Sequence, residues 1–229
     1  MKAVVLLSGG LDSTVCMSIA HKAGFELYPI SFAYGQRHSR EIRCAGQIAG
    51  YYGVKRHLVI TTNMDAIGGS ALTDNIEIPD GDETRKDIPV TYVPARNLIF
   101  LSYALGYAEV LGAGKIFIGV NAVDYSGYPD CRPEFIERFQ QVADYSTRAA
   151  AQDGKEIAVE TPLINLTKAG IIRLGIENRA PLHLTTSCYR GAEKACGTCD
   201  SCLLRLRGFR EAGYEDPVPY EKDCAKGGL

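Results

Sequence analysis

An excess of charge of either sign is the first thing that this sequence lacks. Its 229 residues include 25 Lys and Arg against 27 Asp and Glu, which gives a formal net charge of -2. A protein that holds a polyanion without a dedicated site needs a basic field, because neutralised phosphates supply most of the affinity. We therefore do not expect nucleic acid as a direct partner.

Long apolar runs are missing as well. Spanning a bilayer takes about 20 consecutive apolar residues, and the stretch at residues 98–111 is interrupted by Gly106 and Glu109. The apolar residues 2–7 end at Ser8, which is too soon for the apolar core of a secretory signal. We expect a soluble, cytoplasmic protein that makes no contact with a membrane.

Internal repeats and low-complexity segments are also absent, and 46% of the residues are hydrophobic, enough for one large domain with a real core. Apolar periodicity predicts strands at 2–7, 26–32, 56–61 and 115–120, alternating with helices at 12–23, 37–53, 96–112 and 134–151. This alternation, which continues to about residue 160, is typical of parallel β-α-β units. We predict a doubly wound, mainly parallel Rossmann-like α/β fold, with residues 1–180 as a nucleotide-binding domain and 181–229 as a small metal-binding segment packed on it.

The turn between the first strand and the first helix carries the main chemical signal. Its sequence is Ser8-Gly9-Gly10-Leu11-Asp12-Ser13. Glycines let the backbone approach phosphate oxygens, and backbone N–H groups at a helix start attract an anion. The turn lacks both the Gly-x-x-x-x-Gly-Lys of kinase-like phosphate loops and the Gly-x-Gly-x-x-Gly of dinucleotide-binding folds. Neither γ-phosphate transfer nor dinucleotide binding is therefore expected.

This string resembles the Ser-Gly-Gly-x-Asp-Ser motif of the PP-loop ATP pyrophosphatases. The resemblance implies that ATP is cleaved between its α- and β-phosphates while an oxygen nucleophile becomes adenylated. Amide donors and Mg²⁺ would stabilise the departing pyrophosphate. Ser8, Asp12, Ser13 and Lys168 are the candidate catalytic residues. Asp12 either holds the metal or caps the helix, and Lys168 either reaches the phosphates or is a solvated helix residue.

Two further segments offer groups for ATP and for a planar heterocycle. Arg96 and Asn97 precede a predicted helix and either face the ligand or only begin the helix. The loop after the strand at 115–120 is rich in aromatic and polar residues, as binding loops at strand ends often are. The candidate substrate-binding residues in this loop are Asp124, Tyr125, Ser126, Asp130 and Arg132. Tyr34 and Gln36, which follow the second predicted strand, are further candidates.

Together these segments resemble the 7-cyano-7-deazaguanine synthase family, from the first strand to the cysteines described next. The resemblance implies that 7-carboxy-7-deazaguanine is adenylated, that ammonia converts it to the amide, and that a second ATP drives dehydration to the nitrile. AMP and pyrophosphate leave in each round, and the product enters queuosine biosynthesis. A homodimer is implied by the resemblance alone.

Four of the eight cysteines fall in one short window: Cys188, Cys196, Cys199 and Cys202. Thiols at these intervals suit a tetrahedral zinc ion, and four sulfur ligands leave no open position for catalysis. We predict one structural zinc per chain. The rival interpretation is a tRNA-thiolating PP-loop enzyme, in which Cys199 and Cys202 would carry sulfur or iron. A third is a nucleotide sensor that never cleaves ATP.

Residues 68–89 are polar and rich in turn-forming residues. They predict a surface excursion, which is either a plain long loop or a lid over the site.

Overall fold

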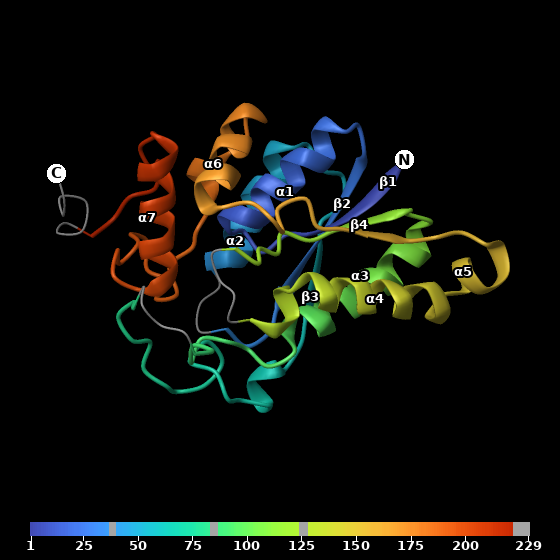
Figure 1. Cartoon of the computed structure of the whole chain (residues 1–229), viewed down its shortest axis with the longest axis horizontal. Coiled ribbons are helices and arrows are strands. Elements are labelled where there is room, and N and C mark those ends of the chain that lie inside the picture. Colours follow the sequence, from blue (N-terminus) through green and yellow to red (C-terminus); the bar gives the residue numbers. More distant parts are fainter. Residues whose placement is uncertain (37–39, 83–86, 124–127, 222–229) are drawn as a thin grey trace.

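A computed structural model describes residues 1–36, 40–82, 87–123 and 128–221, and contains a five-stranded sheet between layers of helices (Figure 1). The strand order is β3-β2-β1-β4-β5, and every neighbouring pair is parallel. The strands are β1 (Lys2–Leu6), β2 (Glu26–Ala33), β3 (Leu58–Thr61), β4 (Lys115–Phe117) and β5 (Ala158–Glu160). The predicted doubly wound α/β fold is confirmed.

Helices cover both faces of the sheet. The α-helices are α1 (Leu11–Lys22), α2 (Arg40–Tyr51), α3 (Arg96–Leu111), α4 (Pro133–Ser146), α5 (Arg148–Asp153), α6 (Lys168–Glu177) and α7 (Asp200–Ala212), and the 3-10 turns are η1 (Met64–Ala66), η2 (Pro129–Cys131) and η3 (Leu182–Leu184). Residues of α1, α2 and α6 share one buried cluster, and residues of α3 and α4 share the other. Figure 1 shows α1 and α6 above the sheet and α3 and α4 below it, with α7 beside α6. Among the described residues, no helix combines the length and apolar character that crossing a bilayer requires.

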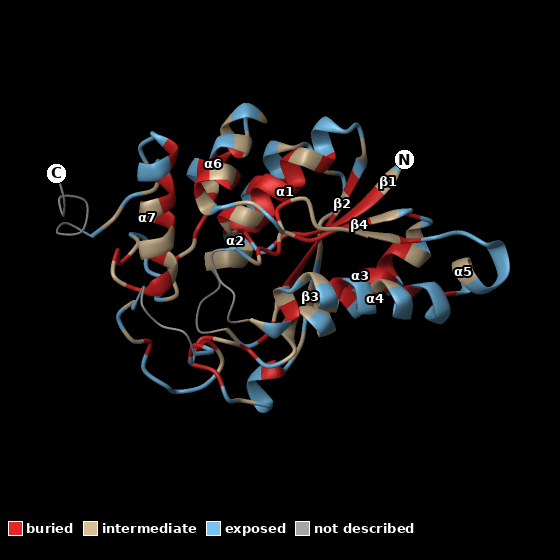
Figure 2. Ribbon diagram, viewed as in Figure 1, coloured by how far each residue is buried: buried red, intermediate tan, exposed pale blue. Residues whose placement is uncertain are grey.

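The central strand β1 explains why two cores form. Val4 and Leu6 belong to the α3 side, whereas Val5 and Leu7 belong to the α1 side, and all four are buried. A strand covered on both faces has no polar alternation, because each side chain meets a helix layer. Figure 2 shows β1 mainly in red, the colour of buried residues, between helices that carry red, tan and pale blue segments.

The strand order creates a crevice at the carboxyl end of β1. Its neighbours β2 and β4 are reached by connections that run in opposite directions, and ligands of open α/β sheets bind at such a switch point. Two glycines bring the walls together there. A Cβ atom on Gly9, whose φ is 86°, would lie 2.3 Å from the carbonyl oxygen of Glu41. A Cβ atom on Gly119 would lie 2.9 Å from the carbonyl oxygen of Asp12.

Two helices differ from the prediction. The helix expected at 134–151 is divided at Thr147, which has extended dihedrals and accepts a hydrogen bond from the Ala150 N–H as the N-cap of α5. Helix α7 was not predicted at all. It packs along α6, and its residues Phe209 and Ala212 share the core of α1. This packing supports our proposal that residues 181–229 form a small metal-binding segment packed on the nucleotide-binding domain.

Backbone hydrogen bonds fix the described part of the excursion at 68–89 to the rest of the chain at two places. The Ala71 N–H donates to the Val90 carbonyl at 2.8 Å, and the Gly81 N–H donates to the Thr198 carbonyl at 2.7 Å. The Asp82 N–H donates to a carboxylate oxygen of Asp200 at 2.8 Å, at the start of α7. The excursion is therefore tied to the cysteine-rich segment.

Candidate active site

A cavity of about 300 Å³ opens at the carboxyl ends of β1 and β4. Predicted site residues that line it are Ser8, Gly10, Leu11, Asp12, Ser13, Tyr34, Arg96, Asn97 and Lys168. Lining residues that sequence reasoning missed include Phe32, Glu41, Phe100, Asn121, Cys131, Thr186, Ser187 and Arg205. The fold thus brings segments from both ends of the chain to one hollow.

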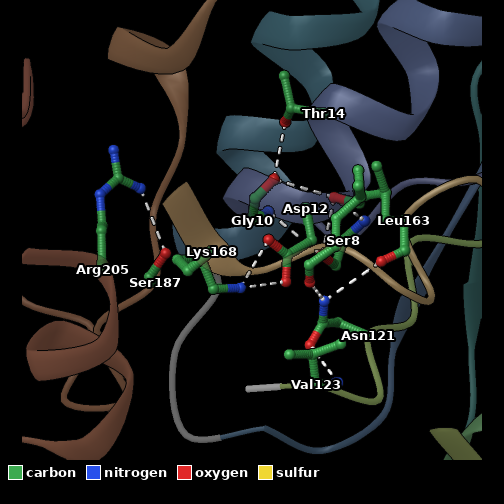
Figure 3. Close-up of polar contacts among 12 residues, drawn as sticks. Ser8, Gly10, Asp12, Thr14, Asn121, Val123, Leu163, Lys168, Ser187 and Arg205 are labelled. Carbon is green, nitrogen blue, oxygen red and sulfur yellow. Dashed lines mark hydrogen bonds and ion pairs between the residues drawn. The ribbon is translucent and has the colours of Figure 1, made fainter. Parts of the chain in front are cut away.

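The turn after β1 is ordered by its own hydroxyl groups. The side-chain oxygens of Ser8 and Ser13 lie 3.0 Å apart, and the Gly10 N–H donates to the Ser8 hydroxyl at 3.2 Å. The hydroxyl of Thr14 donates to the Gly10 carbonyl at 2.8 Å (Figure 3). Gly10 is the N-cap of α1 and provides no side-chain cap. The first amides of α1 therefore face the cavity as donors for an anion.

Asp12 and Lys168 form an ion pair across the cavity. The Lys168 Nζ lies 2.8 and 2.7 Å from the two carboxylate oxygens of Asp12, and their side chains are 14 and 29% exposed. Figure 3 shows the ammonium group pointing at the carboxylate beside Ser8. The helix-cap alternative for Asp12 is not observed, and Lys168 is not a solvated residue. A carboxylate suits Mg²⁺, and an ammonium group suits phosphate.

Lys168 is held in place by its surroundings. It is the first residue of α6, whose N-cap Thr167 accepts a hydrogen bond from the Gly170 N–H. A Cβ atom on Gly208 would lie 2.4 Å from the Lys168 Cγ, so α7 closes on the lysine stem at a glycine. Asn121, after β4, donates to the carbonyls of Leu163 (3.2 Å) and Leu166, which fixes the segment before α6.

Asp130 holds the start of α3. The Asn97 N–H donates to an Asp130 carboxylate oxygen at 2.9 Å, and the Asn97 side-chain amide donates to the Asp130 carbonyl at 3.2 Å. Asp130 is buried and is not a lining residue. Ala95 has a left-handed φ of 54°, which turns the chain just before Arg96. Asp130, which we expected to bind the substrate, therefore orders the cavity wall.

Aromatic rings form the wall that follows β2. Phe32 and Phe100 are stacked with centroids 3.9 Å apart, and Tyr34 lies 5.5 Å from Phe100. Burial raises the pKa of Tyr34 to about 12, an effect that the Glu41 carboxylate reinforces and the Arg96 guanidinium opposes. The Arg96 guanidinium lies over the Tyr34 ring, 5.9 Å from its centroid. A flat, partly apolar molecule fits such a wall.

Two described residues predicted to bind substrate, Gln36 and Arg132, lie outside the cavity lining. Gln36 accepts a hydrogen bond from the Tyr34 N–H at 2.6 Å and donates to the Phe32 carbonyl at 3.2 Å. Arg132 is exposed and is the N-cap of α4. Neither lines the cavity. Asp124, Tyr125 and Ser126 lie outside the described residues.

The four clustered cysteines form a compact group that could hold a metal ion. Their sulfur atoms all lie within 4.8 Å of one another, and all four side chains are buried. Zinc–sulfur bonds of about 2.3 Å in a tetrahedron separate the sulfurs by about 3.8 Å, and the Cys196 and Cys202 sulfurs are 3.9 Å apart. The amides of Thr198 and Cys199 donate to the Cys196 sulfur at 3.5 and 3.4 Å, as expected around a thiolate ligand. The four sulfur donors fit a zinc ion, and they would leave it no open coordination position.

Comparison with known proteins decides the family. The model of the family described as "Queuosine biosynthesis protein QueC" matches residues 2–213. The chain belongs to this family. Curated relatives of the QueC family include "7-cyano-7-deazaguanine synthase 2" of Desulfitobacterium hafniense strain Y51, 64% identical over 96% of this chain and 93% of that protein. The 7-cyano-7-deazaguanine synthase of Acetivibrio thermocellus is 61% identical over 96% of this chain and 97% of its own.

A solved structure outside the QueC family supports the fold. The NMN synthetase of Francisella tularensis superposes with a TM-score of 0.51 and 17% identity, and the match covers 93% of this chain and 78% of that one. At this identity the likeness concerns the fold alone.

Proposed function

We propose that the chain converts 7-carboxy-7-deazaguanine and ammonia to 7-cyano-7-deazaguanine, with cleavage of ATP to AMP and pyrophosphate. The observation that carries the proposal is one cavity in which an open helix start, the Asp12–Lys168 pair and an aromatic wall meet. Membership of the QueC family supports the identity of the heterocycle. The enzyme is then a ligase that forms a C–N bond.

ATP places its β- and γ-phosphates on the amides of the turn at 8–13, so that these donors face the charge that develops on the departing pyrophosphate. Asp12 would hold Mg²⁺, which neutralises phosphate charge. With Asp12 as a ligand of the metal, the Lys168 ammonium would be available to contact a phosphate oxygen. The ion pair therefore keeps the Asp12 carboxylate and the Lys168 ammonium group in position before the nucleotide binds.

Two rounds of the same activation balance the reaction. In the first, a carboxylate oxygen attacks the α-phosphorus, pyrophosphate leaves, and ammonia displaces AMP to give the amide. In the second, the amide oxygen attacks a new α-phosphorus, and loss of AMP with two protons leaves the carbon–nitrogen triple bond. Each round converts a poor leaving group into a good one, so a single cavity serves both steps.

The deazaguanine ring needs an acceptor for its adjacent N1–H and 2-amino donors, and a carboxylate offers two oxygens side by side. Among the described lining residues the carboxylates are Asp12, to which we assign the metal, and Glu41. Glu41 lies in the first turn of α2, and its negative charge acts electrostatically on Tyr34 and Arg96 at the aromatic wall. We therefore propose Glu41 as the acceptor, with Tyr34 and Phe100 beside the ring.

Glu41→Gln is expected to raise the KM for the carboxy-deazaguanine at least about tenfold, because an amide presents only one acceptor atom to two donors. The KM for ATP should stay within about twofold. Initial-rate kinetics with each substrate varied in turn measure both constants. Glu134→Gln, an exposed acid in the first turn of α4, is the matched control. A rise in the KM for ATP alone would assign Glu41 to adenine instead.

We also propose that the metal is zinc with a structural role, that the chain acts in the cytoplasm without a nucleic-acid partner, and that it forms a homodimer. Helix α3 supports the last point, since Leu98, Tyr103 and Val110 are 43, 46 and 85% exposed on a helix with few charges. An exposed apolar helix face favours burial against another surface. The family resemblance implies a second copy of the chain as the partner.

The direct test supplies ATP, Mg²⁺, ammonium and candidate deazapurines and identifies the products by mass spectrometry. We expect the nitrile, with two AMP and two pyrophosphate released per nitrile formed. Omission of ammonium should stop nitrile formation. Failure to form AMP and pyrophosphate above background with the carboxy-deazaguanine would refute the proposal, and sulfide-dependent modification of tRNA would point to the thiolating alternative.

A further inference from the structure

Arg205 is a buried charge in the cavity wall that the proposed reaction does not use. It lies on α7, is 2% exposed and lines the cavity. Its Nε and Nη2 donate to the two carboxylate oxygens of Asp216 at 2.7 and 2.9 Å. Asp216 also accepts from the Tyr220 hydroxyl at 2.7 Å and from the Val218 N–H at 3.2 Å. The guanidinium charge is therefore already neutralised by the C-terminal segment.

The rest of the guanidinium points to the chain before the cysteine cluster. Its Nη1 donates to the hydroxyls of Thr185 and Ser187 at 2.8 and 3.2 Å, and the second contact is drawn in Figure 3. Between these two residues, the Thr186 N–H donates to the Gly9 carbonyl at 2.9 Å. Residues 185–187 thus lie directly against the turn at 8–13, and Arg205 holds both of their outer hydroxyls.

We propose that Arg205 is a positioning residue for the turn at 8–13, oriented by Asp216 and acting through residues 185–187. The inference rests on the proposed function in that this turn is taken to bind the phosphates of ATP. The hydrogen-bonded path runs from Asp216 to Arg205, then to Thr185 and Ser187, and ends at Gly9. It links the C-terminal segment to the turn at 8–13.

The chemistry of the contact favours this role over a purely stabilising one. A buried ion pair adds little net stability compared with apolar residues of similar volume. Arginine offers a planar guanidinium group whose donors have fixed directions. Here it donates to four groups: the Asp216 carboxylate, the hydroxyls of Thr185 and Ser187, and the Leu182 carbonyl. Lysine has the same charge but lacks this planar group. Fixed direction is what a site needs in order to keep amides aligned on a phosphate.

Asp216→Asn tests the inference, because Asp216 is not a lining residue and cannot contact ATP directly. We expect the dissociation constant for Mg²⁺-ATP, measured by isothermal titration calorimetry, to rise about tenfold, since a strong hydrogen bond to a charged group becomes a weak one. The KM for the carboxy-deazaguanine should stay within about twofold. Glu211→Gln changes a surface acid at the end of α7. It is the matched control and should change neither constant.

Arg205→Lys is the second variant and should weaken ATP binding similarly while it keeps the charge. Two results would overturn the inference. One is a lower melting temperature with unchanged ATP binding, which would make the pair purely stabilising. The other is tighter ATP binding in Asp216→Asn, which would make Arg205 a phosphate ligand that Asp216 restrains. Because calorimetry reports binding without turnover, a wild-type protein that binds ATP but forms no nitrile would refute the proposed function and leave this test intact.

Discussion

Lys168→Ala should lower kcat for AMP formation by about a hundredfold to a thousandfold, the usual cost of removing a donor that stabilises transition-state charge. The Lys168 ammonium lies 2.7 Å from the Asp12 carboxylate beside the open start of α1, where the pyrophosphate would leave. Its loss also leaves the Asp12 charge uncompensated next to the phosphates. Pyrophosphate release under saturating ATP and deazapurine measures the effect in steady state.

Asp12→Asn gives the complementary result and separates the two roles. It should raise the Mg²⁺ concentration needed for half-maximal rate, because an amide is a weaker ligand for Mg²⁺ than a carboxylate. Lys168→Ala should leave the Mg²⁺ requirement unchanged. Lys22→Ala is the control, since this lysine bonds to Asn178 at an exposed position. If Lys168→Ala retained most of its kcat and lost only affinity for ATP, the lysine would serve ground-state binding and not the chemical step.

The parts of the site that could be predicted are those that lie together in sequence. The turn at 8–13 and the four cysteines each concentrate a chemistry within a short window, and spacing alone identifies such groups. The alternation of apolar segments likewise predicted β1 to β4, because buried parallel strands are continuous apolar runs, whereas β5 was not predicted. Lys168 and Asp12 were each named as candidate catalytic residues beside the resemblance, but their direct contact across 156 residues of sequence was not predicted.

What could not be predicted depends on contacts between distant segments. Glu41 and Arg205 have no local motif, and only the folded chain places them beside the turn at 8–13. Asp130 was expected to bind substrate because it is a carboxylate on a polar loop, but it is buried and one of its carboxylate oxygens accepts a hydrogen bond from the start of α3. Helix α7 escaped periodicity because Cys202 and Arg205 occupy buried positions where apolar residues are expected.

Removal of the metal should have the largest effect on stability. Structural zinc contributes about 10 kcal/mol or more to the folding of small zinc-binding peptides, and here Cys199 and Cys202 begin the helix that carries Arg205 and Gly208. Cys202→Ala should therefore abolish stoichiometric zinc, lower the melting temperature by more than about 10 °C, and weaken ATP binding as well.

Elemental analysis by inductively coupled plasma mass spectrometry and differential scanning calorimetry provide the two readouts. Cys44→Ala, which removes a buried thiol from α2 outside the metal centre, is the matched control and should keep full zinc content with only the modest loss expected for a small cavity. Iron in place of zinc in the wild-type protein would contradict the structural assignment, because an iron–sulfur centre at Cys199 and Cys202 belongs to the thiolating chemistry. A Cys202→Ala protein that kept both its melting temperature and its affinity for ATP would show that α7 holds Lys168 and residues 185–187 without help from the metal. In that case the C-terminal segment would be joined to the active site by Arg205 and the α6 contact, and the metal would be dispensable for both.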